Sequence, residues 1–160
     1  MSDLFSKVKL IMDELDIQYS EQNSNCFTFF IPVKECILKG WLFCDSKDDL
    51  ILYDTSCEIL VPEDSLSTVM EYFTRANYNM TMGAFQLDLD DGAVFYRVYH
   101  RMRNCEPTND LITELIGYGN SAFDYYFPCM MHIIYGKKSA LEAKEYVHKK
   151  WAERSSEEVS

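Results

Sequence analysis

The stretch from residue 82 to residue 103, MGAFQLDLDDGAVFYRVYHRMR, constrains the fold of this chain more than any other. Runs in which apolar residues recur at every second position flank Asp91-Gly92. An Asp-Gly pair between two such runs is the strongest short-range signal of a β-hairpin. Phe95 and Tyr99 project from one face of this hairpin. A two-residue turn pairs Leu87 with Tyr96 and makes the other face wholly apolar, with Phe85, Leu87, Tyr96 and Val98.

The remaining elements follow from the spacing of apolar residues. Strands rich in aromatic and β-branched residues are predicted at 26–33, 37–45 and 50–61. Amphipathic helices are predicted at 3–16, from 62–65 onward, at 108–116, at 120–135 and at 139–154. Residues 17–25 form a polar connector in this interpretation, Gly117-Tyr118-Gly119 separates two helices, and Pro128 kinks the second of them.

This order of elements, α-β-β-β-α-β-β-α-α, predicts an α+β fold. Hairpin-linked strands in two groups form a five-stranded antiparallel sheet, and the helices pack mainly on one of its faces. A length of 160 residues is that of one domain, which we place at residues 1–154. Residues 155–160 are expected to form a frayed polar tail.

Charge and composition exclude several classes of function. Fifteen basic and 26 acidic residues give a net charge of −11, which repels nucleic acid. The chain has no apolar run long enough for a membrane span, and its start lacks the pattern of a signal peptide. We therefore expect a cytoplasmic protein without a nucleic-acid or membrane partner, and its six scattered cysteines are expected to be reduced.

Two constellations of cysteine and histidine could carry chemistry. Cys129 and His132 share a predicted helix face, where Cys105 or His100 could complete a metal site, and Cys105 with His100 could form a nucleophile pair. Cys129 lies on an apolar stripe, however, and no local motif supports a nucleophile. We therefore expect no catalytic residue, no metal ligand and no cofactor.

Three segments carry a family resemblance in addition to the order of elements. They are GAFQLDLDDGAVFYRVYHRM, the preceding VPEDSLSTVMEYFTRANYN and the later YFPCMMHIIYG. Together they resemble the YbjN family, bacterial proteins for which a role as sensory-transduction regulators has been proposed. The family is similar in fold to the class I chaperones of type III secretion. The resemblance covers roughly residues 1–150 and implies an acidic, cytoplasmic, dimeric protein that binds other proteins without catalysis.

The predicted faces of the sheet suggest where a partner would bind. Aromatic side chains expected on the face without helices are candidates for protein interaction: Trp41, Phe43, Phe95 and Tyr99. The alternative for these aromatics is burial under the kinked helix or under a long C-terminal element. We predict a homodimeric module that binds a protein or peptide through the sheet face or a sheet edge. The alternative function is a small-molecule sensor or enzyme with a pocket between helix 120–135 and the sheet, lined by Tyr118, Tyr125 and Tyr126.

Overall fold

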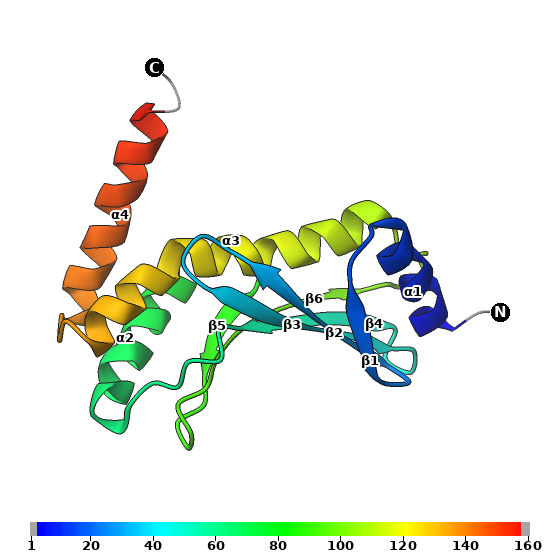
Figure 1. Ribbon diagram of the computed structural model, residues 1–160, viewed down its shortest axis with the longest axis horizontal. Coiled ribbons are helices and arrows are strands. Elements are labelled where there is room, and N and C mark those ends of the chain that lie inside the picture. The colour runs from blue at the N-terminus through cyan, green and yellow to red at the C-terminus, as the bar shows by residue number, and fades with distance from the viewer. Residues whose placement is uncertain (1–2, 158–160) are drawn as a thin grey trace.

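A six-stranded antiparallel sheet and four α-helices form the molecule, and the computed structural model describes residues 3–157 (Figure 1). The helices are α1 (Leu4–Glu14), α2 (Leu66–Asn77), α3 (Asn109–Ile134) and α4 (Ala140–Glu157). The strands are β1 (Tyr19–Asn23), β2 (Cys26–Pro32), β3 (Ile37–Asp45), β4 (Leu50–Ser56), β5 (Ala84–Leu87) and β6 (Val94–Arg101). Their order in the sheet is β1-β2-β3-β4-β6-β5, so the predicted α+β class is confirmed.

The prediction of five strands was wrong because the segment taken as a polar connector contains β1. The sequence of β1, YSEQN, has no apolar alternation, and only its first residue is partly buried. β1 forms because it lies antiparallel to β2, with Tyr19 opposite Phe29, and supplies backbone partners along the outer edge of that strand. An edge strand that buries almost no side chain leaves little trace in the hydrophobic pattern.

The β5–β6 hairpin exists, but its turn is longer than predicted. Leu87 lies opposite Val94, and residues 88–93 connect the strands. Asp88 and Asp91 each accept a backbone N–H two residues ahead at 2.8 Å, which stabilises this longer loop. Gly92 has φ of +80°, and its carbonyl accepts the N–H of Val61. The register differs from the predicted one by two residues, an even number, so every side chain keeps its predicted face.

Helix α3 is one continuous helix where the sequence predicts two. It passes through Gly117 and Gly119 without a break and continues through Pro128 to Ile134, and its ribbon is bent along its length (Figure 1). Gly119 has a packing role instead, because a Cβ there would lie 2.7 Å from both Thr55 Cγ2 and Tyr53 Cε1. This glycine allows α3 to cross β4 at close range, which is a tertiary requirement and not a helix stop.

Three helices, α1, α2 and α3, pack on the same face of the sheet, which we call the covered face. Its largest aromatic cluster surrounds Phe85 of β5. The centroid of that ring lies 4.4 Å from the centroid of the Phe73 ring in α2 and 5.4–5.5 Å from those of Tyr96, Phe123 and Tyr126. At the other end of the sheet, Phe5 of α1 stacks on Phe27 at 4.2 Å. The predicted packing of helices mainly on one face is confirmed.

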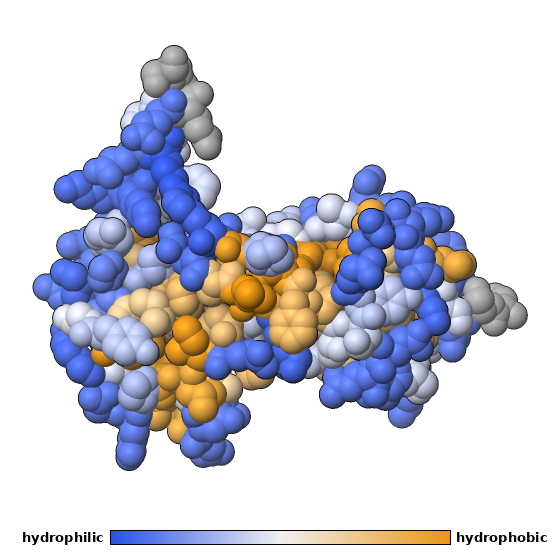
Figure 2. All heavy atoms as spheres, in the orientation of Figure 1, coloured by the Kyte–Doolittle hydropathy of each residue, from blue (hydrophilic) through white to orange (hydrophobic). Residues whose placement is uncertain are grey.

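Helix α4 lies apart from the sheet and contacts α2 and α3. Ser139 and Glu142 form a capping box at the predicted start of this helix, with reciprocal hydrogen bonds of 2.8 and 3.2 Å. Within residues 3–157, all buried residues of α4 lie in its first half. The second half projects from the body of the molecule (Figure 1). Figure 2 shows this projecting part as hydrophilic, whereas hydrophobic residues gather across the middle of the molecule. The helix includes residues 155–157 of the predicted tail, and residues 158–160 lie outside the described residues.

Candidate functional site

The face of the sheet opposite α1, α2 and α3 has no helix over it within residues 3–157, and we call it the open face. Strand alternation places all four predicted interaction residues there. Phe43 and Tyr99 lie in one cross-strand row, on either side of Leu52 in β4. The ring centroids of Trp41 and Phe95 are 5.7 Å apart although their strands are separated by β4. The alternative, burial of these rings under the kinked helix or a C-terminal element, was wrong: within residues 3–157, α3 packs on the covered face and α4 packs on α2 and α3.

The rings of the open face lie beside charged groups. Lys39 Nζ is 5.1 Å from the centroid of the Trp41 ring and 5.9 Å from that of Phe30. Tyr99 is 59% exposed and Phe30 is 63% exposed, while Trp41 is partly buried. The open face therefore presents several aromatic rings to solvent, and aromatic residues are enriched in protein interfaces.

An ion pair that sequence reasoning missed lies at the centre of the open face. Arg97 Nε and Nη2 donate to the two carboxylate oxygens of Asp54 at 2.8 and 2.7 Å. The hydrogen bonds to this carboxylate raise the pKa of Arg97, because they favour the charged guanidinium. Asp54 is nearly buried, at 6% exposure, whereas the Arg97 side chain is 45% exposed. The one signal in the sequence is an aspartate in the middle of a strand, a position where aspartate is rare.

We expect the Arg97→Met substitution to lower the free energy of unfolding by about 1–2 kcal/mol, since it leaves the Asp54 carboxylate without its bidentate partner. Urea unfolding at neutral pH measures this change. Adding Asp54→Asn to the variant should recover part of the loss, because the unpaired charge is then removed. Equal free energies of unfolding for Arg97→Met and for the double variant would show that the Asp54–Arg97 pair does not stabilise this face of the sheet.

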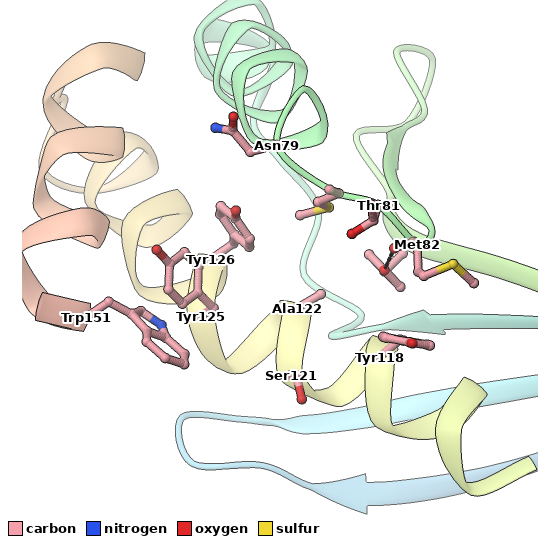
Figure 3. Close-up of a pocket in the computed structure, with 11 residues that line it drawn as sticks. Asn79, Thr81, Met82, Tyr118, Ser121, Ala122, Tyr125, Tyr126 and Trp151 are labelled. Carbon is pink, nitrogen blue, oxygen red and sulfur yellow. Dashed lines mark hydrogen bonds between the residues drawn. The ribbon is translucent and has the colours of Figure 1, made fainter. Parts of the chain in front are cut away.

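The pocket of the alternative interpretation also exists. Tyr118, Tyr125 and Tyr126 line a pocket of about 290 Å³ beside α3, as predicted, and this pocket is widely open to solvent. Sequence reasoning missed the other walls, the loop of residues 79–82 and Trp151 of α4 (Figure 3). These walls lie far from α3 in sequence, and no local pattern joins them to it.

The candidate residues of the metal and nucleophile sites lie in α3, in β6 and in the loop after β6. Cys129, a candidate metal ligand, is buried in α3, and burial raises the pKa of its thiol to about 11, which disfavours the thiolate that a metal ion needs. The His132 ring packs edge-on against Tyr146, with centroids 5.1 Å apart. Among residues 3–157 no cluster of three or more His, Cys, Asp or Glu side chains could hold a metal ion. All six cysteines are free thiols.

Residues 6–131 match the sequence profile of a family described as "Putative bacterial sensory transduction regulator". The chain belongs to the YbjN family. The resemblance carried by the hairpin, by the segment before it and by the aromatic segment of α3 is thereby confirmed. The matched range ends before α4, so the projecting helix lies outside the part that defines YbjN proteins. A search of curated proteins found no match to the chain.

The fold of this YbjN protein is similar to that of a chain in the crystal structure of the ExsC–ExsE complex. The TM-score is 0.57 at 13% identity, and the similarity covers 78% of this chain and 94% of that chain. This structural similarity confirms the expected fold, which resembles that of type III secretion chaperones. A separate search of the described helices found none long and apolar enough to cross a membrane.

Proposed function

We propose that this YbjN protein is a non-catalytic binding module, with a chaperone-like or regulatory role, that holds a protein partner on its open face. The observation that carries the proposal is the contrast between the two faces of the sheet. Three helices cover one face, while the other presents Trp41, Phe43, Phe95 and Tyr99 around the Asp54–Arg97 pair. Aromatic and arginine side chains of this kind supply most of the binding free energy in protein interfaces.

The face supports this role better than either edge of the sheet. At β5, the Asn77 side chain accepts the N–H of Phe85 and donates to its carbonyl, at 2.8 and 3.0 Å. These bonds occupy the backbone groups that an added strand would need. At the opposite edge, β1 presents polar side chains, and Glu21 is paired with Lys9. A partner that buries apolar surface therefore gains most on the open face.

The partner class is supported by charge and by the fold comparison. With a net charge of −11 the protein repels nucleic acid and stays in solution with an apolar segment bound. The similar solved structure is itself a complex of two proteins, ExsC and ExsE. We extend the proposal to a homodimer in the cytoplasm, in which a second copy and the partner both use exposed apolar surface of the protein.

Replacing Trp41 and Phe95 together by alanine tests the proposal. We expect the double variant to keep its circular dichroism spectrum and its cooperative unfolding, because both rings are only partly buried. We expect loss of dimerisation in size-exclusion light scattering, or at least about a tenfold loss of affinity for a partner identified by pull-down with the unmodified protein.

The matched control replaces Tyr78 and Tyr135, which are 88% and 74% exposed and lie outside the sheet. This control variant should behave like the unmodified protein in both assays. Unfolding of the Trp41/Phe95 variant would assign those rings to the core. Equal partner binding by the two double variants would remove the open face from the proposal.

A further inference from the structure

The pocket beside α3 lies away from the open face and is a separate feature of the molecule. Four elements form it: α3 with Tyr118, Tyr125 and Tyr126, the loop of residues 79–82, β6 with Tyr96, and α4 with Trp151. Figure 3 shows the loop above α3, with Trp151 at one end of the pocket and Tyr118 toward the other. Its volume of about 290 Å³ is near the lower end of the range for small-molecule sites.

None of the residues that line the pocket carries a charged side chain. Its tyrosines stay neutral at physiological pH, because burial raises the pKa values of Tyr125 and Tyr126, and raises that of Tyr96 to about 12. A charged ligand group would find no partner of opposite charge among these residues. The pocket therefore favours an uncharged ligand.

The rings around the pocket favour a flat ligand. Tyr125 contacts Tyr126 with centroids 4.5 Å apart and Trp151 with centroids 5.1 Å apart, at interplanar angles of 64° and 50°. Met80 and Met82 form the facing wall, and methionine adapts its shape to an aromatic ring. Rings in several orientations offer both faces and edges to a planar aromatic molecule.

Among residues 3–157, four hydroxyl groups of the pocket form no hydrogen bond and are available for the ligand: those of Thr81, Ser121, Tyr125 and Tyr126. The Tyr118 hydroxyl donates to Glu114 at 2.8 Å, and the Tyr96 hydroxyl donates to the carbonyl of Met82. Within residues 3–157 the hydroxyls of Tyr125 and Tyr126 make no such bond, and each can serve as donor or acceptor. A ligand with its own hydroxyl or amide group would satisfy them.

We propose that this pocket binds an uncharged, planar aromatic small molecule of one or two fused rings that carries a hydroxyl or amide group. The site is independent of the proposed protein-binding face. Because Trp151 comes from α4 and the other walls come from the YbjN domain, a bound ligand would contact both and hold α4 against the domain.

The chain has two tryptophans, one in each site, and their indole N–H signals report on the sites separately. We would titrate nitrogen-15-labelled full-length protein with 2-naphthol and assign the two signals with Trp41→Phe and Trp151→Phe variants. We expect 2-naphthol to shift the signal of Trp151 and leave that of Trp41 unchanged. Naphthalene-2-sulfonate, which has the same rings and a negative charge, should bind at least about tenfold more weakly.

A second variant removes the site without removing a buried side chain. Ser121 lines the pocket but is exposed, so Ser121→Tyr places a ring in the cavity with little effect on folding. We expect at least about a tenfold loss of 2-naphthol affinity in this variant, while partner capture by the open face is unchanged. Absence of any shift at Trp151, a shift at Trp41 instead, or equal binding by Ser121→Tyr would overturn the proposal.

Discussion

Replacing Phe85 with alanine should lower the free energy of unfolding by about 3–5 kcal/mol, the largest effect that we expect from a single substitution in this protein. Phe85 is 5% exposed, and its ring contacts those of Phe73, Tyr96, Phe123 and Tyr126. These rings come from α2, β6 and α3, so no single element can close the cavity that the substitution leaves. Since the total stability of a domain is about 5–15 kcal/mol, Phe85→Ala should be near the limit of folding.

The control for this prediction is Phe95→Ala on the neighbouring strand of the same hairpin. Phe95 lies on the open face, where its ring contacts Trp41 and is only partly buried. We expect a loss of about 1 kcal/mol, since little apolar area returns to water. Urea unfolding with both variants measures the two losses. Similar losses would contradict the assignment of one covered and one open face.

Gly119→Ala should lower the free energy of unfolding by about 2–3 kcal/mol, although alanine is the better helix former. The new Cβ would lie 2.7 Å from atoms of Tyr53 and Thr55, both fully buried, so α3 would have to move away from β4. Such a shift separates the helix from the centre of the sheet and disturbs the core on both sides of the contact.

Gly117→Ala, two residues earlier in the same helix, should have the opposite sign. A Cβ at Gly117 meets no atom within 4 Å, so the helix propensity of alanine acts alone. We expect a gain of about 0.5–1 kcal/mol. Thermal and urea unfolding of both variants would decide between a packing role and a helix break, because a helix-breaking role predicts the same sign at both positions.

Local patterns in the sequence determined the two faces of the sheet. Period-two alternation in β3 and β6 assigned Trp41, Phe43, Phe95 and Tyr99 to one side, and this assignment survived a turn of the wrong length because the register error was even. The start of the last helix at residue 139 was also predicted correctly, since the capping box of Ser139 and Glu142 depends on residues only three positions apart.

Contacts between segments distant in sequence decided the rest. β1 is a strand because β2 has an edge to pair with, and Gly119 is part of a helix because β4 lies beneath it. The partner of Arg97 lies 43 positions earlier, and Trp151 meets Tyr125 only because α4 packs on α3. Hydrophobic periodicity records which side of an element is buried, whereas the identity of the neighbour depends on how the whole chain packs.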